Sequence, residues 1–128
     1  MNITLAESAG FCFGVARAVK KAENFIETGE KACTLGPLIH NPIFVKSLED
    51  RGVYVAKELS DVKDGYTLII RTHGITKELL SEIENSGIRY YDATCPFVKK
   101  IHSIVKERSQ AGDKILIAGD ENHPEVIG

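Results

Sequence analysis

The chain has 128 residues, of which 43% are hydrophobic and 27% charged, and its formal net charge is −2. This composition is typical of a folded domain with its own core, and the absence of any block of Lys or Arg argues against a nucleic-acid surface. No apolar run approaches the roughly 20 residues that span a bilayer, and strand-like sequence from Asn2 onward leaves no room for a targeting peptide.

Short apolar runs alternate with stretches whose apolar residues recur at three- and four-residue steps, the patterns of strands and helices respectively. Glycines after several helical stretches, and Thr76 before one of them, supply end and start signals. The pattern predicts, in chain order, strand 2–6, helix 14–27, strand 31–35, helix 42–51, strand 53–55, a connecting turn at 59–65, strand 66–71, a helix between Thr76 and Gly87, strand 88–92, helix 96–110 and strand 114–118.

This alternation of strands and helices predicts an α/β fold with a largely parallel sheet. In such sheets ligands gather beyond the carboxyl ends of the strands, where the chain turns from strand to helix. Five chemically capable residues fall at predicted junctions of that kind: Cys12, His40, His73, Cys95 and His123. We therefore expect them to converge at one rim of the sheet.

Cys95 stands between a predicted strand and Pro96, a residue favoured at the first position of a helix. That places its thiol at the N-cap, beside free N–H groups and the positive end of the helix dipole. A thiol in such a place loses its proton more easily, and the thiolate is the form that attacks or binds metal. Because the chain has three cysteines without close pairs, a reducing compartment, the cytoplasm, is predicted rather than a disulfide framework.

The Cys95 pattern occurs twice, because Cys12 also opens a helical stretch, with Val three residues on and a cation two further. The two cysteines are 83 residues apart. The same offset relates Gly29-Glu30-Lys31 to Gly112-Asp113-Lys114, Gly36 to Gly119, and His40 to His123. Four landmarks in one register predict an internal repeat. Cys33 has no partner at this offset and is predicted to lie in the core, and His102, on a helix, is interpreted as structural.

Two thiolates and three imidazoles at one rim are suitable ligands for a transition metal. Thiolates favour zinc, copper(I) or an iron–sulfur cluster. Loop histidines can equally hold a phosphate, helped by nearby helix N-termini. Glu125, two residues after His123, could pass protons. From the residue types alone, both metal and phosphate chemistry stay open.

Five motifs, spread from one end of the chain to the other, resemble the LytB family, whose members reduce 4-hydroxy-3-methylbut-2-enyl diphosphate in the non-mevalonate route to isoprenoids. These are Phe11-Cys12-Phe13-Gly14-Val15, Gly36-Pro37-Leu38-Ile39-His40-Asn41, Arg71-Thr72-His73-Gly74, Asp92-Ala93-Thr94-Cys95-Pro96 and His123-Pro124-Glu125. They stand in the order that the family shows, and they cover about two-fifths of such an enzyme.

The resemblance implies a trefoil of three α/β units around a [4Fe–4S] cluster, with 1–93 as the first unit and 94–128 as the first half of the second. It implies that Cys12 and Cys95 are cluster ligands, that His40, His73 and His123 bind the diphosphate, and that Glu125 donates a proton. It also implies a bacterial enzyme that takes electrons from a ferredoxin or flavodoxin and releases isopentenyl and dimethylallyl diphosphates.

The third cysteine that the family uses for its cluster has no counterpart in this chain, and the 83-residue repeat would place it beyond Gly128. We therefore expect an inactive fragment of the reductase. Three other interpretations are open: a non-catalytic α/β module that binds phosphate or a partner, a zinc hydrolase with Glu125 as base, and a disulfide switch between Cys12 and Cys95. The zinc hydrolase lacks the closely spaced ligand pairs usual at such sites.

Overall fold

Four short strands form one sheet in the order β2-β1-β3-β4, and all three pairings are parallel. The computed structural model describes residues 2–127. The strands are β1 (Ala32–Leu35), β2 (Tyr54–Ala56), β3 (Thr67–Ile70) and β4 (Tyr90–Asp92). Every residue of β1 and β3 is buried, as expected of central parallel strands that are covered on both faces.

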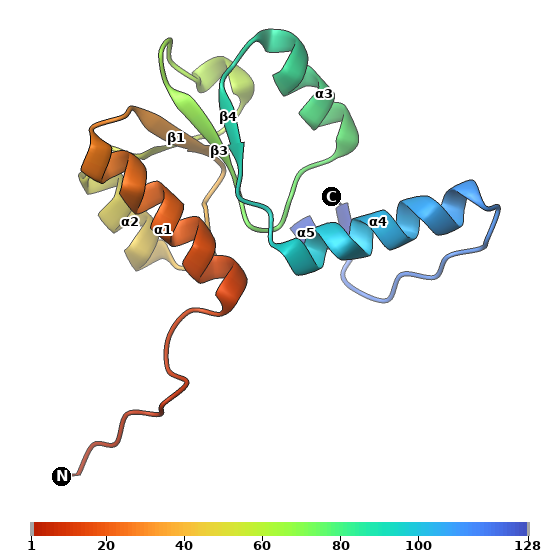
Figure 1. Cartoon of the computed structure of the whole chain (residues 1–128), viewed down its shortest axis with the longest axis horizontal. Coiled ribbons are helices and arrows are strands. Elements are labelled where there is room, and N and C mark those ends of the chain that lie inside the picture. Colours follow the sequence, from red (N-terminus) through yellow and green to blue (C-terminus); the bar gives the residue numbers. More distant parts are fainter. Residues whose placement is uncertain (1, 128) are drawn as a thin grey trace.

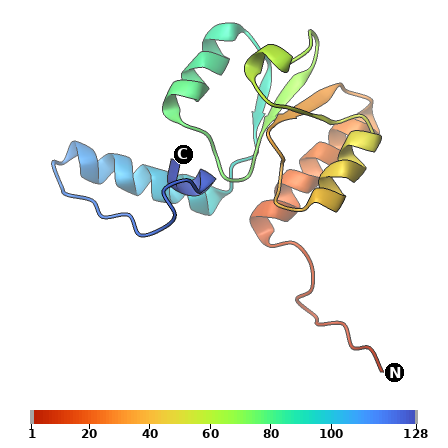
Figure 2. The ribbon, with the colours of Figure 1, turned by 180° about the vertical axis from the view of Figure 1, so that it is seen from behind.

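Helices cover both faces of this sheet (Figure 1). Their bounds are α1 (Phe13–Thr28), α2 (Pro42–Asp50), the 3-10 turn η1 (Leu59–Asp61), α3 (Lys77–Ser86), α4 (Pro96–Gln110) and α5 (Pro124–Ile127). Helices α1 and α2 lie on one face and α3 on the other, an arrangement that Figure 2 shows from behind. The two faces therefore have separate cores.

The core under α1 and α2 includes Ala18, Ala22, Phe25, Leu38, Leu48 and Ile69. The core under α3 includes Cys33, Leu35, Leu68, Ile70 and Ile83. Alternate residues of β3 thus point to opposite faces, as the period of two in a strand requires. Cys33 is completely buried, which confirms the prediction that it belongs to the core.

Local signals start and end the helices as the sequence indicates. Asn41 and Thr76 cap α2 and α3 by accepting from the N–H groups of Phe44 and Leu79. Gly29 and Gly87 follow α1 and α3 with φ of 72° and 73°, a left-handed conformation that favours glycine at this position. The predicted helix 96–110 has the same bounds as α4.

Helix α4 extends away from the sheet, and the segment after it runs back along the helix to α5 (Figures 1 and 2). This return brings the residues around α5 close to the beginning of α4. Among residues 2–127, no helix combines the length and the apolar character that crossing a bilayer would require.

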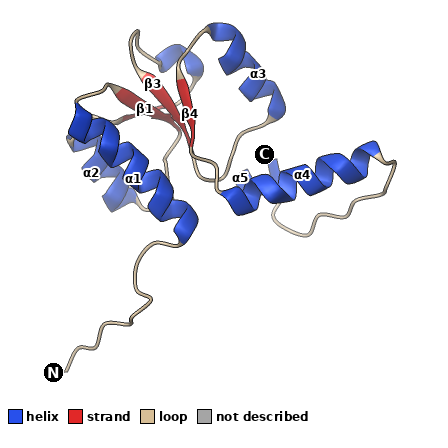
Figure 3. Ribbon diagram, viewed as in Figure 1, coloured by secondary structure: helices blue, strands red, loops and turns tan. Residues whose placement is uncertain are grey.

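The α/β class and the parallel sheet are confirmed, but two predicted strands are wrong. Residues 2–6 and 114–118 are irregular, as Figure 3 shows in tan. Their apolar residues are exposed, with Ile3 at 82% and Leu116 at 95% of full exposure. Both segments have a strand-like composition, but a strand also needs a neighbouring strand to pair with its N–H and C=O groups, and neither pairs with another in residues 2–127.

Candidate active site

The carboxyl ends of β1 and β3 form a topological switch point. From β1 the chain crosses through α2 to β2 on one side, and from β3 it crosses through α3 to β4 on the other. The two connecting loops therefore diverge, and the crevice between them is the usual ligand site of open α/β sheets. His40 lies in the loop after β1, and His73 in the loop after β3.

Three imidazoles gather beyond this switch point. The ring centroids of His40 and His73 are 4.4 Å apart, and His123 lies 6.2 Å from His40 and 6.1 Å from His73. His123 lies just before α5, and the segment that returns along α4 brings it to the other two imidazoles. The strand predicted before His123, at 114–118, is absent. His40 and His123 are exposed and His73 is half-buried. The three rings thus form a cluster that is open to solvent.

His73 has a lower pKa than an ordinary histidine, so the folded protein favours its neutral ring. Burial lowers the pKa of His73, and the charge of His40 lowers it further, whereas Glu125 acts in the opposite direction. Its Nδ1 atom is buried and has no hydrogen-bond partner in the described residues. Such an atom is costly to leave unpaired, so the ring is available to a ligand group that can donate to it or, after protonation, accept from it.

Glu125 lies at the start of α5, and its backbone N–H donates to His123 Nδ1 at 3.3 Å. This contact leaves the carboxylate of Glu125 exposed, and its charge acts on the pKa of His73. An exposed carboxylate next to three imidazoles can exchange protons with a molecule bound among them.

Cys12 and Cys95 are the N-cap residues of α1 and α4, and neither side chain makes a capping hydrogen bond. Their thiols are therefore free of the contact that a Ser or Asp would make at these positions. The two helices begin beside each other (Figures 1 and 2). The Sγ atom of Cys95 lies so close to Gly14 that a Cβ there would stand 2.6 Å from it.

The two cysteines can thus supply two sulfur ligands from adjacent helix N-termini. Within residues 2–127, no group of three or more His, Cys, Asp or Glu side chains is arranged to hold a metal ion. Cys33 does not join the pair, because it is buried in the core and interacts with Tyr54, and burial raises the pKa of its thiol. His102 packs near Gly74 instead of joining the three imidazoles.

The family model for the LytB protein matches residues 3–128. The chain belongs to the LytB family. A LytB relative named 4-hydroxy-3-methylbut-2-enyl diphosphate reductase, from Caldanaerobacter subterraneus, is 49% identical over 132 residues that cover 100% of this chain and 46% of the relative. A relative of the same name from Aquifex aeolicus is 45% identical and is covered to 44%.

Two solved structures of diphosphate reductases have the same fold. One, described as the terminal enzyme of the non-mevalonate pathway, matches 98% of this chain and 45% of its own with a TM-score of 0.83 and 44% identity. The other, from Plasmodium falciparum, matches 95% of this chain and 39% of its own with a TM-score of 0.87 and 34% identity. The chain thus spans less than half the length of the LytB relatives it matches.

Sequence reasoning assigned no role to two residues beside Cys95, Arg17 and Asp92, although Asp92 stands in one of the five motifs. Arg17 Nη2 donates to the carbonyl of Thr94 at 2.6 Å, and Asp92 Oδ1 accepts from the N–H of Thr94 at 2.9 Å. The one available signal for Arg17 was its place in the repeated pattern, five residues after Cys12. That spacing identifies a cation on the helix, but it cannot identify a partner 77 residues away.

Proposed function

We propose that this chain supplies part of a reductase that removes the allylic hydroxyl of 4-hydroxy-3-methylbut-2-enyl diphosphate. The products are isopentenyl and dimethylallyl diphosphates. The observation that carries the proposal is the cluster of His40, His73 and His123 at the switch point of a LytB fold, next to two helices that each begin at a cysteine. The names of the relatives supply the substrate.

The three imidazoles bind the diphosphate in this proposal. Their spacing of 4.4 to 6.2 Å allows several rings to donate hydrogen bonds to one anion. The lowered pKa of His73 reflects burial and the nearby positive charges of other groups, and a bound polyanion offsets those charges. The substrate would therefore be bound together with a proton.

Cys12 and Cys95 fit two of the thiolate ligands of a [4Fe–4S] cluster. Gly14 supports this fit, because its missing side chain leaves the space that the Cys95 sulfur occupies beside α1. When bound, such a cluster supplies electrons and an iron that can act as a Lewis acid. We propose that the third thiolate comes from outside these 128 residues, so that this chain alone does not turn over.

Glu125 is the proposed proton donor, because its exposed carboxylate lies beside the imidazoles. The reaction breaks the allylic C–O bond, uses two electrons and two protons, and releases the hydroxyl as water. One proton goes to the departing oxygen and the other to carbon. We propose a ferredoxin or flavodoxin as the electron donor and, because the ligand thiols must stay reduced, a cytoplasmic site.

Calorimetry with inorganic diphosphate and with the substrate tests the imidazole cluster. His40→Ala and His73→Ala should each weaken binding about 10- to 100-fold, the effect of losing one charged hydrogen bond. His102→Ala is the matched control, because it removes a histidine outside the cluster. Equal binding by all variants would contradict the proposed site and favour a scaffold without a diphosphate site.

Anaerobic reconstitution with iron and sulfide tests the cysteines. Cys12→Ala and Cys95→Ala should lower the bound iron, whereas Cys33→Ala should leave it unchanged. Zinc bound in preference to iron, in oxygen-free preparations, would instead support a hydrolase. A stable four-iron cluster with turnover in the 128-residue chain would contradict the proposal that a third ligand comes from elsewhere.

A further inference from the structure

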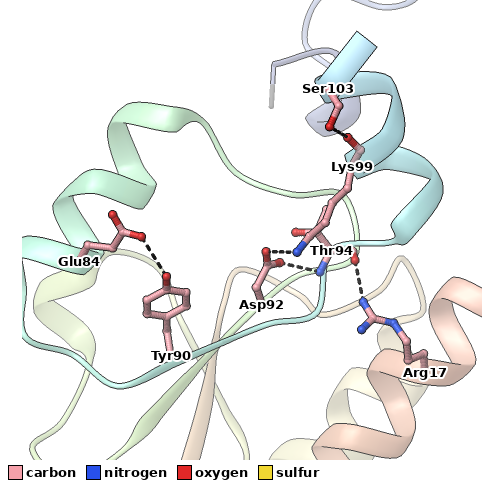
Figure 4. A network of polar contacts seen from close by, with 7 residues as sticks. All are labelled: Arg17, Glu84, Tyr90, Asp92, Thr94, Lys99 and Ser103. Atoms are coloured by element: carbon pink, nitrogen blue, oxygen red, sulfur yellow. Dashed lines mark hydrogen bonds and ion pairs between the residues drawn. The ribbon is translucent and has the colours of Figure 1, made fainter. Parts of the chain in front are cut away.

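Both backbone polar groups of Thr94, the residue immediately before Cys95, are hydrogen-bonded to side chains (Figure 4). Its N–H donates to Asp92 Oδ1 at 2.9 Å, and its carbonyl accepts from Arg17 Nη2 at 2.6 Å. The next N–H, that of Cys95, donates to the carbonyl of Thr72 at 2.9 Å. The backbone that presents the Cys95 thiol is therefore fixed by three elements, α1, β4 and the loop after β3.

Among these hydrogen-bonding residues, Arg17 connects the helix that begins after Cys12 with the loop that leads to Cys95. It lies on α1, the helix that begins at Cys12, and its partner lies one residue before Cys95. The contact is short and comes from a charged donor, so it belongs to the stronger class of hydrogen bonds. In the part of the chain that the structure describes, α1 also meets this region through packing, where the Cys95 sulfur lies beside Gly14 and the ring centroids of Phe13 and Phe97 are 6.5 Å apart.

Asp92 strengthens this arrangement from the other side. Its Oδ2 atom lies 2.5 Å from Lys99 Nζ on the second turn of α4. Burial alone would raise the pKa of Asp92, but the hydrogen bonds from Lys99 and Thr94 together hold it below its ordinary value. Asp92 thus stays ionised and ties the loop to α4, whereas Arg17 ties the same loop to α1.

We propose that Arg17 is a positioning residue, which fixes the N-termini of α1 and α4 relative to each other so that Cys12 and Cys95 address one metal centre. This inference rests on the proposed role of the two thiols. Lys is an incomplete substitute, because its shorter, flexible side chain ends in a strongly hydrated ammonium, whereas the rigid guanidinium of Arg loses less freedom for each hydrogen bond formed. The Nε atom of Arg17 is buried and has no partner among the described residues, so this edge of the guanidinium lies against the protein while Nη2 reaches the Thr94 carbonyl.

Phenylarsine oxide tests the inference without a cluster or turnover, because it binds tightly only where two thiols can reach one arsenic atom. The full chain carries Cys33→Ala in every sample, so that only Cys12 and Cys95 respond. Competition with a small dithiol gives the affinity. Arg17→Met should weaken binding about tenfold, the effect of losing one charged hydrogen bond that holds two groups together, and Arg17→Lys should recover part of the loss.

Lys20→Met is the matched control, because it removes an exposed cation from the same helix and should leave the affinity unchanged. Alkylation of Cys12 in a Cys95→Ala background should be equally fast with and without Arg17, since positioning acts on the pair and not on one thiol. If Arg17→Met fails to fold by circular dichroism, the comparison of Arg17→Lys with the parent chain decides.

The outcomes separate the two proposals. If the parent chain does not bind the arsenical through both thiols, Cys12 and Cys95 are not held close together and the role of Arg17 is overturned, whereas the cluster proposal is judged separately by the iron bound on reconstitution. If the parent chain binds the arsenical and Arg17→Met binds it equally tightly, only the role of Arg17 is overturned. Where Arg17→Met does not fold, equal binding by Arg17→Lys has the same meaning.

Discussion

The Cys95 sulfur lies against Gly14, in the first turn of α1, where a Cβ would stand 2.6 Å from the sulfur and 3.1 Å from the Cys95 Cβ. Glycine is therefore required here by close approach of another side chain and not by backbone conformation. The relationship joins the beginnings of two helices that are far apart in the sequence, and it can be tested by adding a single methyl group.

Gly14→Ala should destabilise the fold or displace the Cys95 thiol. Alanine in a helix gains roughly 0.5–1 kcal/mol over glycine, but overpacking costs about 1–3 kcal/mol, so we expect a net loss of about 1 kcal/mol in the free energy of unfolding. Urea denaturation measures it. In a Cys95→Ala background the clash with sulfur is gone and only the approach to the Cβ at 3.1 Å remains, so the same substitution should cost clearly less. An equal loss in both backgrounds would contradict the close contact.

Asp92→Ala should cost more than Asp92→Asn. The asparagine keeps an oxygen for the Thr94 N–H and loses only the half-exposed pair with Lys99, worth about 0.5 kcal/mol. The alanine also loses the backbone contact, for a total of about 1.5–2 kcal/mol. Thermal or urea unfolding at neutral pH distinguishes the two variants. Equal effects would show that the Thr94 hydrogen bond contributes little.

His73 should make stability depend on pH. Because its pKa in the folded chain lies below the ordinary value of 6.5, both states carry a neutral ring above that value, and His73 has no effect there. As the pH falls below 6.5, the unfolded chain binds a proton that the fold resists, and stability decreases until the pKa of the folded state is reached.

Urea unfolding from about pH 7.5 to about pH 5 measures this dependence. His73→Asn should make the free energy of unfolding depend less on pH. The difference from the parent chain should stay below about 1 kcal/mol over this range, because the ring is partly solvated. The pKa of Asp92 lies below its ordinary value of 3.8, so this carboxylate is protonated only at a lower pH and does not interfere. An unchanged slope in the variant would show that the pKa of His73 is ordinary.

Diphosphate binding should take up protons. A bound polyanion favours the charged imidazoles, so the affinity should rise as the pH falls toward about 6. Calorimetry in two buffers with different ionisation enthalpies gives the number of protons bound. His73→Ala should lower that number, whereas His102→Ala should leave it unchanged. Binding without proton uptake would indicate that the rings contact the anion as neutral donors only.

Cys33→Ala should affect only the packing of the core and therefore the stability of the fold. Cys33 lies on β1, the strand between β2 and β3, where it is paired with Tyr54 and Leu68, and its fully buried side chain belongs to the core under α3. Its truncation should cost about 1–2 kcal/mol of stability. Denaturation monitored by circular dichroism checks the cost.

Local features were predictable from the sequence. Pro96 after Cys95, followed by a helical apolar period, defines α4 within one short stretch, and the same holds for α3 between Thr76 and Gly87. His40 and His73 follow buried strands, so their arrival at one edge follows from parallel topology.

Features that depend on distant partners were not predictable. Residues 114–118 have the composition of a strand, but pairing is decided by a neighbour that the local pattern cannot specify. Arg17 has the ordinary appearance of an exposed helical cation, and only the fold brings it to Thr94. His123 was expected for a wrong reason, as the residue after a strand, and reaches the other imidazoles through the returning segment instead.

The uncovered segments 2–6 and 114–118 also affect how the chain behaves outside its site. Each combines β-branched or large aliphatic side chains with backbone that pairs with no strand in the described residues, and Ile3, Leu5 and Leu116 are largely exposed to water. Such stretches promote intermolecular strand pairing and precipitation. Preparations at high concentration should therefore self-associate, and placing a lysine at residue 5 or 116 is the simplest way to keep them dispersed.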